Sequence, residues 1–320
     1  MCYESFRAGR LANGRCVAFD AEDLSERLPS QKRDTRPKCS PRVYNAAQNR
    51  ETLNTTLDRR TMTLPDGTQP SDMDTWMIKE MVPGLYDAIV WDKQVKGEPQ
   101  DMATSVFEEF QVLKGTKLVD REAFSLGTAE LCGCTTLIII SRRGVYMGHY
   151  WESISFNPDK VWLDHYGDKD KCFEKTVIDG LTSGVRSGGS QEQVSLKGQA
   201  SKIEDQYIKA YLMIPTESNN DVVDGYRDRW TQMKDTVNEF VPTINTPPLP
   251  PPPGTVPPPG PAPKNRWTEV KYDALNNGNP LLQTTARGRV LFKFDPNENG
   301  KKRAALWVEQ NATPYHNDVW

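Results

Sequence analysis

Residues 128–151 read TAELCGCTTLIIISRRGVYMGHYW and carry the clearest structural signal in the chain. Residues 135–140 form a β-branched apolar run, residues 142–144 (Arg-Arg-Gly) have turn character, and residues 145–151 form a second strand-like run. Two such runs around a short polar turn predict a β-hairpin.

The flanking sequence alternates between helix-like and strand-like segments. Apolar residues at helical spacing predict a short helix beginning near Trp76 and further helices over residues 102–113, 173–184 and 226–240. Strand-like runs occupy residues 208–214, 267–272, 288–294 and 303–308. We therefore expect an α+β fold with a mixed or antiparallel sheet, either open or sandwich-like, and two or three covering helices.

Composition divides the 320-residue chain into four segments. Residues 1–72 are polar with weak periodicity, which predicts a largely irregular N-terminal arm. Residues 73–246 form the predicted α+β core, and residues 247–264 a proline-rich linker in polyproline II conformation. Residues 265–320 supply C-terminal strands that we expect to dock on the core sheet.

Net charge and hydropathy disfavour nucleic-acid binding and a membrane-spanning segment. A net charge of −3 gives no field to attract nucleic acid, and no run of about 18 apolar residues predicts a membrane span. Met1 to Arg15 lack the apolar region of a secretory signal, while sequons at Asn54 and Asn311 and two dibasic sites favour a processed, secreted protein. The compartment stays open on this evidence.

Cys134 and His149 are the candidate catalytic pair. A cysteine hydrolase needs a thiol activated by an imidazole, with donors aimed at the developing oxyanion. Cys134 precedes the first hairpin strand and His149 lies on the second, at similar distances from the turn, so pairing would bring them together. Cys132 and Gly133 form the turn whose N–H groups would hold the oxyanion.

Other interpretations of the same residues stay open. Cys134 and His149 are also compatible with simple packing in a buried strand. His165, next to Asp164, is an alternative base, and Cys132, Cys134, Cys172 and His165 could form a zinc site, although a single Cys-x-Cys is weak evidence for metal.

The Leu131-Cys132-Gly133-Cys134 box resembles the Leu-Ser-Gly-Cys box of the cytotoxic necrotizing factor family of bacterial deamidase toxins, with the same fifteen-residue step to His149. Thr128, six residues before Cys134, matches the threonine of the Thr-Cys-His triad in the CheD-like glutamine deamidases. The resemblance covers about residues 128–149 and departs at Cys132, where the toxins have serine.

This resemblance implies a protein-glutamine deamidase, able also to act as a transglutaminase, that works through a thioester at Cys134. His149 would be its base, Thr128 would orient the imidazole, and a protein with an accessible glutamine would be the substrate. No cofactor or metal is expected. The alternatives are another cysteine hydrolase, or a non-enzymatic interaction protein whose tract at 247–263 binds an SH3, WW or profilin-type groove.

Three further polar residues are expected to have no catalytic role. His316 lies near the C-terminus, and Glu152 and Asp159 are interpreted as solvated charges on loops or strand edges, with a place at the rim of the site as the alternative for Glu152.

Overall fold

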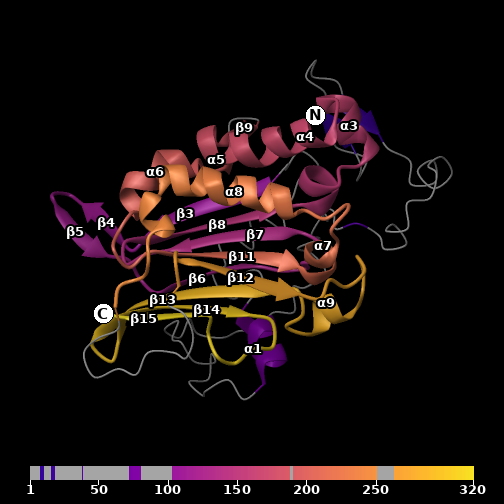
Figure 1. Ribbon diagram of the computed structural model, residues 1–320. Coiled ribbons are helices and arrows are strands. Elements are labelled where there is room, and N and C mark those ends of the chain that lie inside the picture. Colours follow the sequence, from indigo (N-terminus) through magenta and orange to yellow (C-terminus); the bar gives the residue numbers. More distant parts are fainter. Residues whose placement is uncertain are drawn as a thin grey trace.

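The computed structural model describes residues 8–10, 16–18, 38, 72–80, 103–187, 190–250 and 263–320. They form three layers, with helices on one five-stranded sheet and a four-stranded sheet on its other face (Figure 1). The predicted α+β class is confirmed.

The five-stranded sheet is mixed. Its strands lie in the order β12 (Trp267–Tyr272), β11 (Lys209–Pro215), β7 (Thr135–Ile140), β8 (Gly144–Tyr150) and β3 (Ala103–Glu109). All neighbours are antiparallel except β11 and β12, which run parallel. The predicted hairpin is its centre, because β7 and β8 pair from Ile140 with Val145 to Thr135 with Tyr150.

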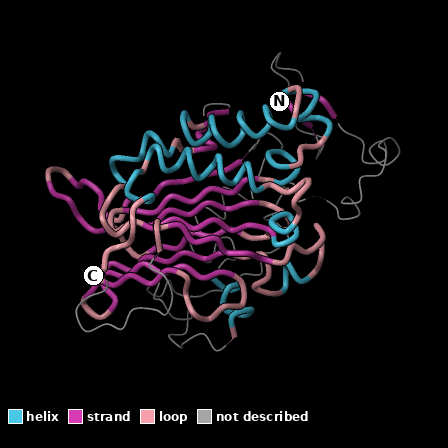
Figure 2. The backbone as a smooth tube through the Cα atoms, viewed as in Figure 1, coloured by secondary structure: helices cyan, strands magenta, loops and turns pink. Residues whose placement is uncertain are grey.

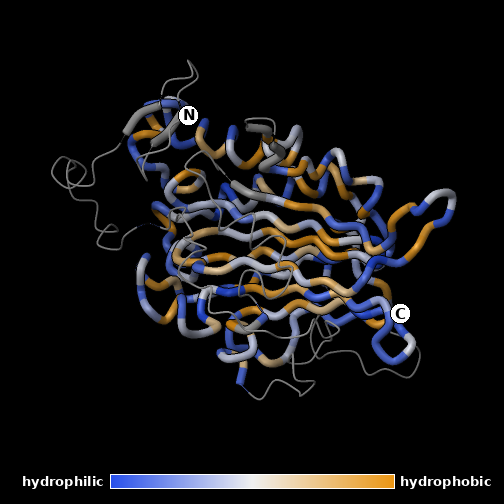
Figure 3. Tube along the Cα trace, turned by 180° about the vertical axis from the view of Figure 1, so that it is seen from behind, coloured by the Kyte–Doolittle hydropathy of each residue, from blue (hydrophilic) through white to orange (hydrophobic). Residues whose placement is uncertain are grey.

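The second sheet is antiparallel, in the order β15 (His316–Val319), β14 (Lys301–Val308), β13 (Val290–Glu298) and β6 (Phe124–Thr128). The inner faces of the two sheets share one apolar core, in which the rings of Phe110 and Phe294 stack at 4.1 Å. The architecture is therefore sandwich-like. Hydrophobic residues follow the strands, and the loops are mainly hydrophilic (Figure 3).

Helices cover the free face of the five-stranded sheet (Figure 2). This layer comprises α4 (Lys169–Phe173), η2 (Glu174–Ile178), α5 (Asp179–Ser183), α6 (Leu196–Ile203) and α8 (Arg227–Phe240). The predicted helices at 173–184 and 226–240 are present, and Gly184 ends the first with a φ of 72°. Short elements at the ends of the layers are η1 (Glu152–Phe156), α3 (Lys160–Tyr166), α7 (Thr216–Asn220), η3 (Pro242–Asn245) and α9 (Leu281–Thr284).

Helix α1 (Met73–Glu80) packs on the outer face of the second sheet. The Trp76 and Trp307 rings meet edge to face at 4.9 Å, and Lys293 Nζ lies 2.7 Å from Glu80 Oε2 in a fully buried ion pair. The predicted short helix near Trp76 is therefore present. The charge of its last residue, Glu80, is neutralised by Lys293 inside the protein.

The helix predicted over 102–113 is wrong. These residues form β3, a bend at Phe110 and β4 (Gln111–Lys114), which pairs with β5 (Lys117–Asp120). Val106 faces the core between the sheets, and its neighbour Phe107 packs on the helical side. A strand covered on both faces has adjacent apolar residues, so it resembles a helical pattern.

The C-terminal strands belong to both sheets. β12 pairs with β11, and β13 pairs with β6 from Val290 with Thr128 to Phe294 with Phe124. Asn299 and Gly300, with φ of 54° and 82°, make the turn to β14. Residues 251–262, which include most of the proline tract, lie outside the described residues. Two further small sheets are β1 (Ala8–Arg10) with β2 (Cys16–Ala18) and β9 (Val185–Ser187) with β10 (Ser190–Gln193).

Candidate functional site

The candidate residues gather at the end of the sandwich opposite the β7–β8 turn, here called the site end. β6 ends there at Thr128, β7 begins there at Thr135, and β8 ends there at Tyr150. The two central strands of one sheet and the edge strand of the other therefore present their termini to one region.

Thr128 and His149 are in contact across the two sheets. Thr128 Oγ1 lies 2.6 Å from His149 Nδ1, and both residues are about 1% exposed. The contact predicted between residues 21 positions apart is present. A hydroxyl on Nδ1 fixes the imidazole plane and leaves Nε2 as the reactive nitrogen.

His149 is held as a neutral imidazole. Its ring lies against Trp151, with centroids 4.0 Å apart. Burial lowers the pKa of His149 to about 3, because the charged form loses its water. Among the residues that the structure describes, His149 Nε2 has no hydrogen-bond partner. In the tautomer whose Nδ1–H donates to Thr128, Nε2 carries the lone pair that a general base needs, while burial weakens the imidazole as a base.

Cys134 lies diagonally from His149 rather than directly opposite. Thr136 is the residue paired with His149, so strand alternation places Cys134 on the same face, two residues further toward the site end. The Cβ atoms of diagonal neighbours are about 7–8 Å apart or slightly closer. Cys134 is fully buried in the core between the sheets, together with Trp151.

Both cysteines of the Cys-x-Cys box are disulfide-bonded. Cys172, by contrast, is a free and buried cysteine. The free thiol expected at Cys134 is therefore absent in this state. A disulfide sulfur is no nucleophile, so thiol chemistry at this position requires reduction first.

Gly133 forms the sharp turn before β7, with a φ of 138° that favours glycine. Its N–H donates to the Tyr272 hydroxyl at 3.0 Å, and that hydroxyl donates to the Cys134 carbonyl at 2.6 Å. The Gly133 N–H expected to hold an oxyanion is thus occupied by Tyr272. No sequence signal pointed to Tyr272, because it lies 138 residues beyond Cys134 on β12.

Two further polar atoms at this end are buried without a partner in the described part of the chain. They are Thr136 Oγ1, opposite His149, and Nε1 of Trp151, which stacks on His149. Buried polar groups are nearly always hydrogen-bonded, so these atoms on and next to one histidine are an exception to the usual pattern.

The alternative assignments lack this geometry. His165 lies on α3, and its ring contacts Tyr166. The Cys172 thiol donates to the Trp162 carbonyl, and burial raises its pKa to about 11. No group of three His, Cys, Asp or Glu side chains within the described ranges is arranged to hold a metal ion.

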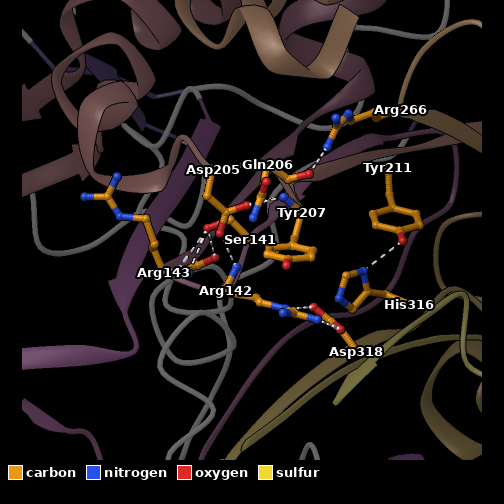
Figure 4. A network of polar contacts seen from close by, with 11 residues as sticks. Ser141, Arg142, Arg143, Asp205, Gln206, Tyr207, Tyr211, Arg266, His316 and Asp318 are labelled. Atoms are coloured by element: carbon orange, nitrogen blue, oxygen red, sulfur yellow. Dashed lines mark hydrogen bonds and ion pairs between the residues drawn. The ribbon is translucent and has the colours of Figure 1, made fainter. Parts of the chain in front are cut away.

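Glu152 was expected to be solvated and is instead buried, accepting a hydrogen bond from Tyr226 at 3.0 Å. Glu152 is the first residue of η1, two residues after the end of β8 at Tyr150. His316 is buried too, with Nδ1 2.9 Å from the Tyr211 hydroxyl, beside the polar network at the turn end of the hairpin (Figure 4).

Comparison of the chain with protein-family models, with curated proteins and with solved structures gave no match in any of the three. In the described ranges, no helix is both long and apolar enough to cross a membrane.

Proposed function

We propose that the reduced chain is a protein-glutamine deamidase that uses Cys134 as nucleophile and His149 as base. The observation that carries the proposal is the 2.6 Å contact of Thr128 with His149 Nδ1, combined with the unpartnered His149 Nε2 on the face that Cys134 shares. This arrangement orients one imidazole nitrogen and leaves the other for proton transfer.

The reaction follows from these residue types. His149 Nε2 takes the Cys134 thiol proton, and the thiolate attacks the carboxamide carbon of a glutamine side chain. The tetrahedral intermediate expels ammonia with the proton that His149 returns, which leaves a thioester. Water then hydrolyses the thioester to glutamate and restores the thiol; a primary amine in place of water gives transglutamination.

The unpartnered atoms of Thr136 and Trp151 support an amide substrate. A carboxamide offers both a carbonyl acceptor and N–H donors, and the site offers an indole donor, a hydroxyl and an imidazole acceptor. In this proposal the Trp151 N–H holds the substrate oxygen, a role that the occupied Gly133 N–H does not fill.

The test is incubation of the chain, pretreated with a dithiol, with a mixed pool of folded proteins. Particular glutamines should gain about one dalton, with release of ammonia, and Cys134→Ser should abolish both signals because a serine hydroxyl, with a far higher pKa than a thiol, is not ionised by an imidazole tuned for a thiolate. Equal conversion by wild type and Cys134→Ser would refute the proposal.

A second interpretation is favoured by the disulfides on Cys132 and Cys134 and by the full burial of Cys134. In a non-enzymatic interaction protein these bonds would only staple the fold. That interpretation expects reduction to lower the midpoint of thermal unfolding without creating a reactive thiol at Cys134.

A further inference from the structure

Residues 216–226 connect β11 to α8 at the site end. β11 runs antiparallel to β7, with Met213 opposite Thr136, so the chain leaves β11 next to the start of β7. It then forms α7 and a loop, residues 221–226, before α8 begins at Arg227. α7 therefore lies at the end of the layers where the candidate residues gather (Figure 1).

Both ends of this connection are bonded to residues beside the candidate site. Thr216 Oγ1 donates to the carbonyl of Tyr272 at 3.0 Å, and Tyr272 supports the turn that precedes β7. At the other end, the Tyr226 hydroxyl donates to Oε1 of Glu152, the first residue of η1, at 3.0 Å. The connection is therefore held both to the five-stranded sheet and to the segment that continues from β8.

Residues 221–224, here called the valine turn, carry two exposed aliphatic side chains. Val222 and Val223 are 80% and 84% exposed, more than any other large apolar side chain in the described part of the chain. Asp221 Oδ1 accepts hydrogen bonds from the N–H groups of Val223 at 2.8 Å and Asp224 at 3.0 Å. Because these bonds already order the turn, little conformational entropy is lost when a partner covers the valines.

The charge around the valines is negative. Glu217, Asp221 and Asp224 are the charged residues of 216–226, and all three are acidic. Arg227, the first basic residue beyond them, donates its Nε to a carbonyl within the same connection. An apolar turn with acidic neighbours is complementary to an aliphatic side chain flanked by lysine or arginine, and it repels an acidic surface.

We propose that the valine turn is the surface on which the deamidase docks its protein substrate. The substrate class is a protein that presents an aliphatic side chain next to lysine or arginine, close to the glutamine that is converted. This inference rests on the proposed function for the identification of the partner as a substrate. The turn selects the protein, whereas the chemistry stays with Cys134 and His149.

The β4–β5 hairpin supplies a matched control. Leu113 and Leu118 are cross-strand partners that are 69% and 63% exposed. They lie at the turn end, where the hairpin projects beyond the end of β3 (Figure 1). Their neighbours Lys114 and Lys117 are basic. The two exposed apolar pairs therefore differ in position and in the sign of the charge beside them, so they favour different partners.

The test is binding of a short fluorescein-labelled peptide, in which one glutamine lies between two leucines and two lysines. Fluorescence anisotropy measures its binding to the full chain at low salt. Replacing both valines by serine (Val222→Ser, Val223→Ser) should weaken binding by at least about tenfold, because the apolar contact is lost. Replacing both leucines (Leu113→Ser, Leu118→Ser) should leave binding at the wild-type value.

A second peptide tests the charge. With glutamates in place of its lysines, the peptide should bind wild type more weakly, since like charges then face each other at the valine turn. Equal binding of both peptides, no binding by wild type, or wild-type binding by the valine variant would overturn the docking surface. A loss confined to the leucine variant would overturn it too, because the partner would then dock at the β4–β5 hairpin.

The two proposals fail separately, because peptide binding requires neither a thiol nor His149. A chain that binds the lysine peptide through the valine turn but converts no glutamine leaves the turn as a peptide-binding surface and refutes the deamidase. Conversion of glutamines in the mixed protein pool by the valine variant at the wild-type rate refutes the docking surface and supports the deamidase.

Discussion

Each of the two buried histidines of the β-sandwich has a hydroxyl next to Nδ1, but the other polar groups around the two rings differ. His149, at the site end, has Nδ1 2.6 Å from the hydroxyl of Thr128; His316, at the turn end, has Nδ1 2.9 Å from the hydroxyl of Tyr211. Burial lowers the pKa of each to about 3. Of the two, only His149 has a ring nitrogen that is buried without a partner in the described structure.

The polar groups around the two histidines show the same contrast. At the turn end Arg142 makes two hydrogen bonds to Asp318, at 2.8 and 2.9 Å, and its guanidinium lies 3.5 Å above the Tyr207 ring (Figure 4). At the site end Thr136 and Trp151 each bury a polar atom that has no partner. Arg142 and Asp318 therefore satisfy each other, whereas the unpartnered atoms of Thr136 and Trp151 lie next to His149.

The largest expected effect separates the histidines by activity. After dithiol treatment, His149→Gln should lower the deamidation rate by about 10²- to 10⁴-fold, the usual contribution of a general base. His316→Gln should retain the wild-type rate below its unfolding temperature, because its network lies at the opposite end. Ammonia release from a common substrate pool measures the rate of both variants. An equal loss of rate in both would contradict the assignment of His149, rather than His316, as the base.

The second prediction uses what the histidines have in common. In the unfolded chain each binds a proton near pH 6.5, whereas the folded protein keeps them neutral down to about pH 3. The unfolded state therefore binds more protons in this window, and stability falls with decreasing pH by up to about 1.4 kcal/mol per unit for each histidine.

Removing either histidine should flatten this dependence. Urea unfolding of His149→Gln and His316→Gln at several values between pH 7 and 4 should show a smaller loss of the free energy of unfolding than in wild type. An unchanged slope in His149→Gln alone would mean that water already reaches the site end.

The structural features that were predictable from the sequence are those set by residues close together in the chain. The hairpin followed from a β-branched run, a polar turn and a second run, and the contact of Thr128 with His149 was implied by the family resemblance over residues 128–149. Residues 102–113 were misassigned because β3 is covered on both faces, so Val106 and Phe107 are both apolar.

Distant partners were not predictable. Tyr272 reaches the Cys134 turn only because β12 adds in parallel beside β11, after a proline-rich insertion. Six cysteines gave no indication of which were bonded, and local patterning cannot give it, because connectivity depends on the tertiary fold. His316 was expected to have no catalytic role, and its position near the C-terminus gave no indication that it is buried.

Tyr272→Phe tests the support of the Cys134 turn. The variant keeps the ring but leaves the Gly133 N–H and the Cys134 carbonyl without the hydroxyl that joins them, at a cost of about 1–3 kcal/mol in the free energy of unfolding. Tyr211→Phe, which removes a single hydroxyl at the turn end, is the matched control. Cys134 labelling by iodoacetamide after reduction should change in Tyr272→Phe alone, and labelling that changes equally in both would show a general loss of stability.

Thr128→Val should give the smallest effect and the sharpest assignment. Valine keeps the shape of threonine but removes the hydroxyl from His149 Nδ1, so the imidazole loses one hydrogen bond without losing its packing. A hydrogen bond is worth about 1 kcal/mol, which corresponds to a three- to tenfold lower kcat, with KM unchanged because Thr128 does not touch the substrate. Thr128→Ser should restore the rate, since serine returns the hydroxyl to the same position.

Tyr211→Phe removes the equivalent hydroxyl from His316 and should leave kcat at the wild-type value. A fall in kcat for Thr128→Val that Thr128→Ser does not reverse would assign the residue to packing, and a fall of the same size in Tyr211→Phe would show that kcat reports stability rather than the orientation of His149.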